Sequence, residues 1–393
     1  MTSRTPGRRA VTQGALAGAA ALFLGTAAVA PATARPGGPV LRLPAPSGPY
    51  PVGATVRHLV DHSRNDPWVP GIGVRELMVT VLTPAVPGGR GFPRMPQLTP
   101  GAAALFAQLG PLIRPHLPRA GVDWAVTLTH ARAGAPPLHP PLLGRRPVLL
   151  YSPGGGDSRA MGSSLAIDLA SSGWTVVTVD HPGDASEVEF PTARPGRDRV
   201  RETALRPDMG AATFRTMVDT RVADLRFVLD ALGLDRVGLY GHSAGGTAVA
   251  QALHEDRRIA AAAVLEGYLD GMDGTLLPVA RDGVDRPVLL AGTDGFRDDR
   301  LDRSWSALLA HGGPVVRRQL DDSGHWIFTD YAALVPQLQE AGLMTAEGRA
   351  AMVGTADPRV SVPTVRRLLR SFFARHLPVP AAVPPTRGRA ASQ

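Results

Sequence analysis

The chain has 393 residues, of which 44% are hydrophobic, enough to bury the core of one large domain. It contains no cysteine, which excludes disulfide bonds and thiol chemistry. The formal net charge is +8, but every basic residue is arginine and the arginines are scattered among acidic residues. Without a basic stripe, the composition does not indicate a nucleic-acid partner.

The N-terminal residues have the pattern of an export signal. Arg8 and Arg9 precede an uncharged run from Ala15 to Ala30, and Ala32-Thr33-Ala34 forms a small-x-small cleavage site. We interpret residues 1–34 as a signal peptide, and the paired arginines indicate the twin-arginine route. A membrane anchor is the alternative, but the apolar run is short for a bilayer span. We therefore expect a secreted protein without a stable membrane anchor.

The rest of the chain divides into a linker, a catalytic domain and a tail. Residues 35–73 are interpreted as a linker and N-terminal extension, rich in proline and glycine up to residue 50. The domain is expected over residues 74–377, beginning with a strand at Val74–Leu82. Ala102–Ile113 has apolar residues at helical spacing and is either a core-facing helix or a cap over the site. Residues 378–393 are expected to be a disordered tail.

From residue 122 onward, strand and helix patterns alternate. The expected strands are 124–129, 147–151, 175–179, 237–240, 261–265, 288–291 and 315–319, and the expected helices are 163–171, 215–232, 247–254, 301–309 and 365–376. This order predicts an α/β fold with a mostly parallel sheet covered by helices on both faces. The first strands remain open to antiparallel pairing.

The most informative motif is Gly-x-Ser-x-Gly at residues 241–245. It follows an apolar strand and precedes an Ala-rich helix, the context of a nucleophile elbow, in which a serine is exposed on a strained strand-to-helix turn. Gly241 and Gly245 are expected because strand and helix pack too closely there for a side chain. We therefore predict that Ser243 is a nucleophile; an inert serine in a tight turn is the structural alternative.

A serine nucleophile requires a base, and the base requires an acid that orients it. His325 follows the expected strand 315–319 and is the candidate base. Glu266 and Asp294 each follow a strand between the serine and the histidine in chain order. The usual place of the acid, after the strand before the histidine strand, favours Asp294.

The Gly-rich segment Ser152–Gly156 directly follows an apolar strand. Its glycines allow the backbone to approach a substrate carbonyl and to direct an N–H at the developing negative charge. The second N–H is expected from Ala244, the residue after the nucleophile. A phosphate-binding loop is the alternative, but the Gly-Lys-Ser/Thr ending is absent.

Taken together, these motifs resemble the α/β-hydrolases, and within them the platelet-activating-factor acetylhydrolases and their bacterial lipase-like relatives. The resemblance runs from Val74 to Leu377 and is carried by the segments 75–79, 151–156, 180–185, 241–246 and 324–325. It implies that Ser243 is the nucleophile, His325 the base, and Gly155 and Ala244 the oxyanion-binding amides. The family acid is an aspartate at the position of Glu266 in Leu265-Glu266-Gly267, so the resemblance favours Glu266, with Asp294 as the alternative. Pro153 stands where many members have histidine.

The sequence thus predicts a secreted serine carboxylester hydrolase that needs no cofactor and no metal. By resemblance, its partners are small-molecule or lipid esters with short, acetyl-type acyl groups. The alternatives are a broader lipase or polyesterase, an acyltransferase with the same triad, and a catalytically silent binding protein with this fold. The sequence leaves the oligomeric state open.

Overall fold

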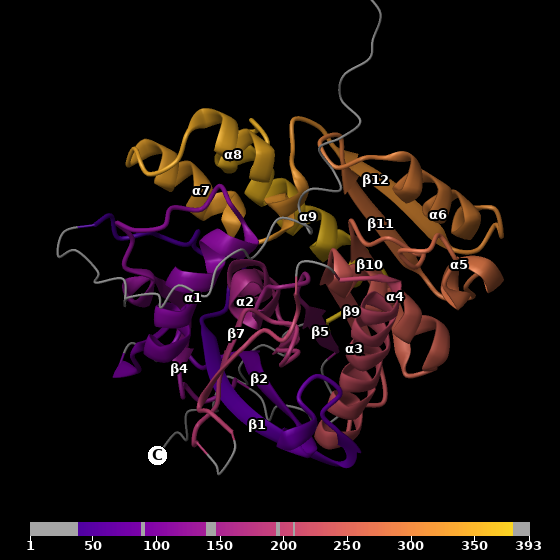
Figure 1. Ribbon diagram of the computed structural model, residues 1–393, viewed down its shortest axis with the longest axis horizontal. Helices are drawn as coiled ribbons and strands as arrows, with labels where there is room; N and C mark the ends of the chain where they lie inside the picture. Colours follow the sequence, from indigo (N-terminus) through magenta and orange to yellow (C-terminus); the bar gives the residue numbers. More distant parts are fainter. Residues whose placement is uncertain (1–37, 88–90, 139–146, 194–196, 207–208, 380–393) are drawn as a thin grey trace, which may run out of the picture.

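The computed structural model describes residues 38–87, 91–138, 147–193, 197–206 and 209–379. The expected signal peptide and residues 380–393 of the expected tail lie outside these ranges. Most strands belong to one ten-stranded sheet, in the order β12-β11-β10-β9-β5-β6-β2-β1-β4-β3 (Figure 1). The strands are β1 (Val52–Asn65), β2 (Val74–Pro84), β3 (Arg94–Pro96), β4 (Leu128–Ala133), β5 (Val148–Ser152), β6 (Thr175–Val179), β9 (Val237–His242), β10 (Ile259–Leu265), β11 (Val288–Thr293) and β12 (Val315–Leu320). A separate pair is formed by β7 (Glu187–Glu189) and β8 (Val200–Glu202).

The central part of the sheet, from β12 to β6, is parallel, as predicted. β2 pairs antiparallel with β6, and β1 pairs antiparallel with β2, so the first strands use the option that the sequence left open. Alternate residues of β5 point to opposite faces: Leu149 and Tyr151 join one apolar cluster, and Val148 and Leu150 the other. Because both faces of the sheet are buried, its central strands appear in the sequence as continuous apolar runs.

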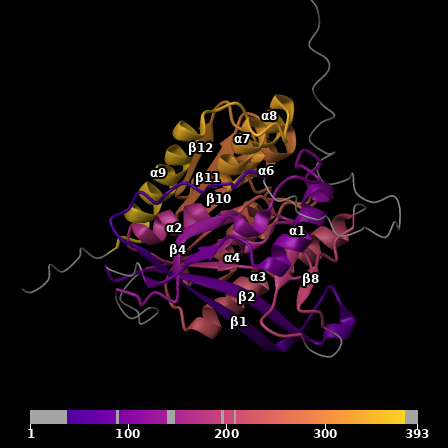
Figure 2. The ribbon, with the colours of Figure 1, turned by 90° about the vertical axis from the view of Figure 1, so that its left-hand side faces the viewer.

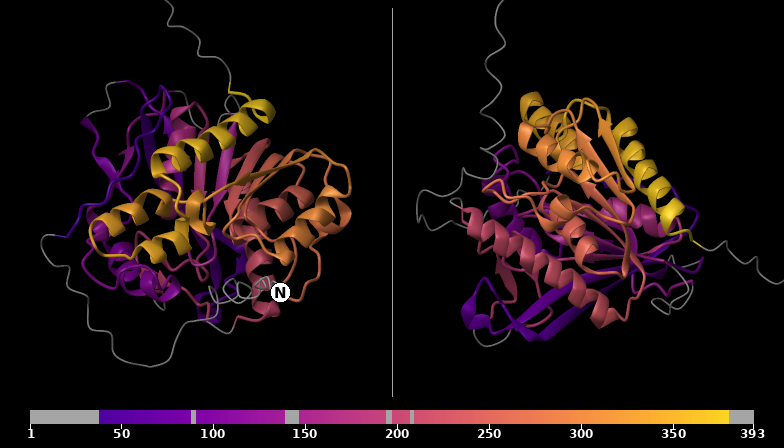
Figure 3. Two further views of the ribbon diagram at one scale, coloured as in Figure 1. Left: turned by 90° about the horizontal axis from the view of Figure 1, so that it is seen from above. Right: turned by 90° about the vertical axis from the view of Figure 1, so that its right-hand side faces the viewer.

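Helices cover the two faces. The helices are α1 (Pro100–Ile113), α2 (Ser163–Ser171), α3 (Ala211–Leu232), α4 (Ala244–Glu255), α5 (Pro278–Asp282), α6 (Asp299–Leu309), α7 (Tyr331–Glu340), α8 (Ala346–Val353) and α9 (Pro358–His376). Side chains of α1, α2, α7, α8 and α9 pack into one cluster, and those of α3 to α6 into the other. Figure 2 shows α2 and α9 together on one side, and Figure 3 shows α3 running along the opposite side. α1 is a core-facing helix, because its Phe106 is 1% exposed.

Two expectations about the first half of the chain are wrong. Residues 35–73, expected as a linker and N-terminal extension outside the catalytic domain, are part of its sheet and core, because Val52–Asn65 forms β1 and pairs along most of β2, and Leu41 is buried. The expected strand 124–129 is a 3-10 turn at Trp124–Val126 followed by β4. The folded domain therefore includes residues before Val74.

Two C-terminal helices were not predicted. α7 contains Pro336 in its interior, and α8 is short and built largely from small residues, so neither has a strong helical pattern in sequence. Both pack beside the loop that carries His325. In the part of the chain that the structure describes, no helix has the length and apolar character of a bilayer span.

Candidate active site

Ser243 lies on the turn between β9 and α4, with a backbone conformation (φ 53°, ψ −122°) that non-glycine residues rarely adopt. From Val237 to Leu253, it is the one residue that is partly exposed rather than buried. The flanking glycines are required by close packing: a Cβ at Gly241 would lie 2.3 Å from the carbonyl oxygen of Gly245, and a Cβ at Gly245 would lie 2.0 Å from the carbonyl oxygen of Ser152. The geometry is that of the predicted elbow.

His325 and Glu266 are brought together by the fold. His325 Nδ1 lies 2.7 Å from Glu266 Oε2, although the two residues are 59 positions apart. The other carboxylate oxygen accepts hydrogen bonds from the backbone N–H and the hydroxyl of Thr293, each at 2.5 Å. Glu266 directly follows β10, and the N–H of Ser243 donates to the carbonyl of Leu265 at 2.8 Å. The acid and the elbow therefore share one corner of the sheet.

Asp294, the alternative acid, has a different role. Its carboxylate accepts the backbone N–H groups of Asp322 and Ser323 at 3.0 and 3.1 Å. These bonds hold the loop that leads to His325, and no contact joins Asp294 to the imidazole within the described residues. The arrangement selects Glu266 as the partner of His325.

His325 is 8% exposed and is surrounded by rings. The ring of Phe296 stacks on it with a centroid distance of 3.7 Å, and the ring of His242, beside Ser243, lies 4.5 Å away. Burial lowers the pKa of His325, and the positive charge of Arg114 acts in the same direction. The imidazole is therefore neutral at neutral pH, the state that a general base requires.

The segment Pro153–Gly156, which we call the oxyanion loop, follows β5 and faces the elbow. A Cβ at Gly155 would lie 3.7 Å from the Cβ of Ala244, so the two predicted amide donors are neighbours. Among the described residues, no protein acceptor takes the N–H of Gly155 or of Ala244. Both donors are free to bind a negatively charged oxygen.

Comparison with known proteins identifies the family of this fold. A family model for the alpha/beta hydrolase fold matches residues 147–300, which include the elbow and Glu266. The solved structure of a ferulic acid esterase from Streptomyces cinnamoneus is 34% identical, with a TM-score of 0.68, over 86% of this chain and 93% of its own. The chain belongs to the α/β-hydrolase family.

Two curated relatives of this α/β-hydrolase are named as an esterase and as an acetylhydrolase. A protein of Arthroderma benhamiae named "Probable 1-alkyl-2-acetylglycerophosphocholine esterase" is 29% identical over 58% of this chain and 59% of its own length. The platelet-activating factor acetylhydrolase of Bos taurus is 28% identical over 31% of this chain and 35% of its own length. The chain thus matches less than two thirds of the length of either relative, and the family resemblance seen in the motifs is supported.

Sequence reasoning missed several residues around the site of this hydrolase. Arg114, at the end of α1, pairs with Asp157 at 2.5 Å, next to the oxyanion loop. Arg221 of α3 lies beneath the same loop and is fully buried. A signal for Arg221 exists in the sequence, because it lies on the apolar stripe of α3 between Met217 and Leu225, where a charged residue is unexpected.

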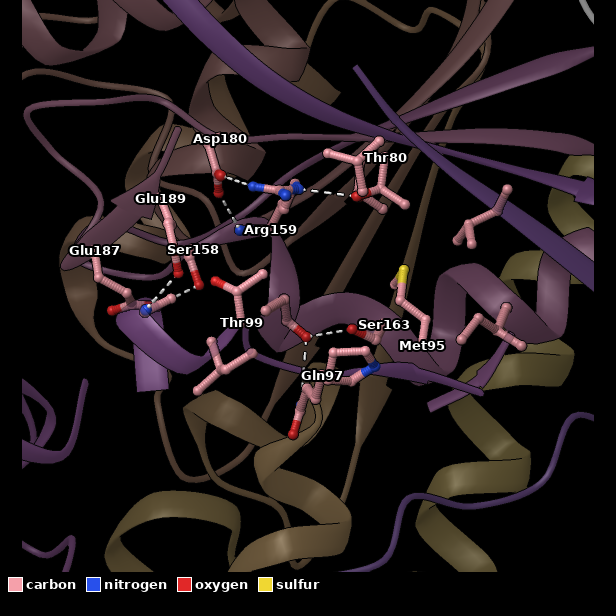
Figure 4. Close-up of a pocket in the computed structure, with 18 residues that line it drawn as sticks. Thr80, Met95, Gln97, Thr99, Ser158, Arg159, Ser163, Asp180, Glu187 and Glu189 are labelled. Atoms are coloured by element: carbon pink, nitrogen blue, oxygen red, sulfur yellow. Dashed lines mark hydrogen bonds and ion pairs between the residues drawn. The ribbon is translucent and has the colours of Figure 1, made fainter. Parts of the chain in front are cut away.

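A cavity of about 160 Å³ lies between α1, α2 and the sheet, and Figure 4 shows its lining. It includes Glu187, which is 1% exposed, and Arg159, which pairs with Asp180. Neither Ser243 nor His325 lines it, so this cavity is separate from the elbow and from the His325 loop. The described residues contain no group of three or more side chains suited to hold a metal ion.

Proposed function

We propose that the protein is a serine carboxylester hydrolase with Ser243 as nucleophile, His325 as base and Glu266 as acid. The observation that carries this proposal is the 2.7 Å contact between Glu266 and His325, next to a serine in a strained and partly exposed turn. The free N–H groups of Gly155 and Ala244 supply the remaining component, an oxyanion hole.

The proposed reaction follows from these positions. Ser243 Oγ attacks the ester carbonyl while His325 accepts its proton, and Glu266 stabilises the imidazolium that forms. The N–H groups of Gly155 and Ala244 bind the tetrahedral oxyanion. His325 then protonates the leaving alcohol, and the same histidine activates the water that releases the acyl group from Ser243.

For the substrate, we propose short-acyl esters, including acetyl esters of lipids. The support is the names of the curated relatives, a probable 1-alkyl-2-acetylglycerophosphocholine esterase and a platelet-activating factor acetylhydrolase. A second candidate is an aromatic acyl ester, because the ferulic acid esterase is similar over 93% of its length. Fold and triad do not decide between these substrates.

We also propose that the enzyme acts outside the cell, after export through the twin-arginine route and removal of residues 1–34. The support is the paired Arg8 and Arg9, the apolar run and the small-x-small site. N-terminal sequencing of the protein recovered from the culture medium tests this; a product that stays with the cells and retains its first residues would contradict it.

The activity test is a series of p-nitrophenyl esters from acetate to palmitate, together with methyl ferulate. A maximum at acetate or butyrate supports the short-acyl proposal, a maximum at long chains indicates a lipase, and preference for ferulate indicates the aromatic ester. Ser243→Ala should lose activity and covalent labelling by a fluorophosphonate. Hydrolysis by Ser243→Ala at the wild-type rate, or a folded wild-type protein that neither hydrolyses an ester nor reacts with the probe, would refute the proposal.

A further inference from the structure

Arg221 has an unusual set of hydrogen bonds beneath the oxyanion loop. Its side chain is fully buried, and each of its five N–H groups has an acceptor. Two donate to the carboxylate of Asp184 at 2.5 and 2.7 Å. The other three donate to the carbonyl of Pro153 at 2.5 Å, the carbonyl of Gly154 at 3.1 Å and Ser152 Oγ at 3.2 Å. The guanidinium therefore binds three consecutive residues at the end of β5.

The bond from Arg221 to the Gly154 carbonyl, together with the bond that the same carbonyl accepts from the N–H of Asp157 at 3.1 Å, determines where the N–H of Gly155 points. The Gly154 carbonyl and the N–H of Gly155 belong to one peptide unit, which is planar and trans, so its C=O and N–H point in opposite directions. Arg221 binds the carbonyl from the buried side of the loop. The N–H of Gly155 consequently points to the other side, where Gly155 is partly exposed and next to Ala244.

A second buried layer holds Arg221 and the end of β5 in place. Ser152 Oγ lies 2.9 Å from His181 Nε2, and His181 Nδ1 lies 3.0 Å from Asp224. Arg75 binds Asp224 through two N–H groups at 2.7 and 3.1 Å. Burial and the charge of Arg221 lower the pKa of His181, so its neutral ring donates a hydrogen bond from Nδ1 to Asp224 and accepts a hydrogen bond from the Ser152 hydroxyl at Nε2.

This layer has the order Ser-His-Asp, but it is not a second active site. Ser152, His181 and Asp224 are all 0% exposed, so no ester can reach the hydroxyl. Ser152 Oγ also accepts a hydrogen bond from Arg221. The layer instead gives Ser152, His181 and Arg221 fixed hydrogen-bond partners beneath the loop, which favours one conformation of the loop.

We propose that Arg221, held by Asp184 and Ser152, is a positioning residue that aims the N–H of Gly155 at the oxyanion. This role rests on the proposed function, because it matters only where an oxyanion forms. Arg221 does not touch the substrate. Its effect is exerted on the transition state, since the N–H of Gly155 binds the negative charge that develops there.

Arg221→Lys tests the proposal, because a lysine keeps the charge but cannot bind Asp184 and two carbonyls in the fork geometry of a guanidinium. The matched control is Arg366→Lys. Arg366 is also buried and donates to two carbonyls, those of Pro44 and Ala45, neither of which belongs to the oxyanion loop. Both variants are assayed with the best p-nitrophenyl ester of the wild type, and their folding is checked by thermal melting.

For Arg221→Lys we expect kcat to fall about 30- to 1,000-fold, near the loss seen when an oxyanion donor is removed, with KM within about threefold. Affinity for a boronic acid, whose tetrahedral adduct with Ser243 mimics the oxyanion, should fall in parallel. Arg366→Lys should keep the wild-type kcat. A folded Arg221→Lys protein with kcat within threefold of wild type would overturn the proposal.

Ser152→Ala is the second variant, in case Arg221→Lys does not fold. It removes one acceptor of Arg221 with little change in volume, and we expect kcat to fall about 3- to 10-fold at constant KM; an unchanged kcat would count against the role of Arg221. Failure of the proposed function can be told apart from failure of this role of Arg221. In the first case the wild type would lack ester hydrolysis and labelling, or Ser243→Ala would keep the activity, before Arg221→Lys or Ser152→Ala is assayed.

Discussion

Replacing Glu266 with glutamine should remove most of the activity without unfolding the protein. The carboxylate has two distinct oxygens: Oε2 faces His325 Nδ1, and Oε1 accepts two hydrogen bonds from Thr293. Glutamine has the same shape but only one acceptor oxygen. Because the N–H and hydroxyl of Thr293 both donate, the glutamine oxygen should occupy the Oε1 position and its NH2 group should face His325.

The size of the effect follows from this orientation. An NH2 group opposite Nδ1 stabilises the tautomer with its proton on Nε2, which cannot accept the proton of Ser243. Turning the amide over would sacrifice the two bonds to Thr293, at a cost of about 2–3 kcal/mol. At 1.36 kcal/mol per tenfold, roughly 1 molecule in 30 to 150 keeps the correct tautomer. Loss of the negative charge beside the imidazolium adds to this, and replacement of the acid by an amide in such triads costs about 10⁴ in kcat.

The assay is the steady-state kcat for p-nitrophenyl acetate, with thermal melting as the check on folding. Asp294→Asn is the matched control, because it makes the same chemical change in the rival acid. Asparagine can still accept one of the two loop N–H groups, so we expect kcat within about fivefold and a stability loss of about 1 kcal/mol. If Glu266→Gln kept more than a tenth of kcat, or Asp294→Asn lost as much as Glu266→Gln, the assignment of the acid would be refuted.

Three further outcomes are expected. Gly154→Ala should lower kcat at least tenfold and Tm by several degrees, because its Cβ would lie 2.9 Å from His242 Nδ1 beside the oxyanion loop. The control is Gly71→Ala, whose Cβ enters open space and which should change neither kcat nor Tm in the same kinetic and melting assays. Burial raises the pKa of Glu187 from 4.5 to about 8, so the protonated carboxyl stabilises the fold below pH 4.5 and this stabilisation is lost as the pH rises to 8. Glu187→Gln should therefore flatten the curve of Tm against pH between 4.5 and 8. An unchanged curve would show that this carboxyl does not cause the pH dependence of Tm. Phe296→Ala should admit water beside His325 and raise the pKa of this histidine, so the acidic limb of the pH profile of kcat/KM should move to higher pH. An acidic limb that stays at the same pH would show that the stacked Phe296 ring does not contribute to the desolvation of His325.

Local sequence patterns were sufficient to predict the strands and helices of the central sheet, but not the strand β1 or the helix α7. The α2 helix was predicted with its observed bounds, Ser163–Ser171, because its apolar residues and flanking turns lie close together in sequence. β1 was missed because polar residues such as Thr55, Arg57 and His58 interrupt its apolar residues. Its pairing with β2 stabilises it instead. α7 was missed because Pro336 is normally a sign of a helix boundary, and here tertiary packing overrides it.

The sequence by itself determined the strained turn that carries Ser243, the proposed nucleophile, because the conformation of this residue depends on residues within two positions of it and on the alternation of strand and helix around it. The tertiary structure decided between Glu266 and Asp294, since both follow a parallel strand and only the spatial order of β10, β11 and the His325 loop determines which carboxylate reaches Nδ1. It also decided the place of Arg221, which lies 67 residues from the carbonyl of Gly154 that it binds. A backbone turn is a local property, whereas a hydrogen bond across the core exists only after the sheet has assembled.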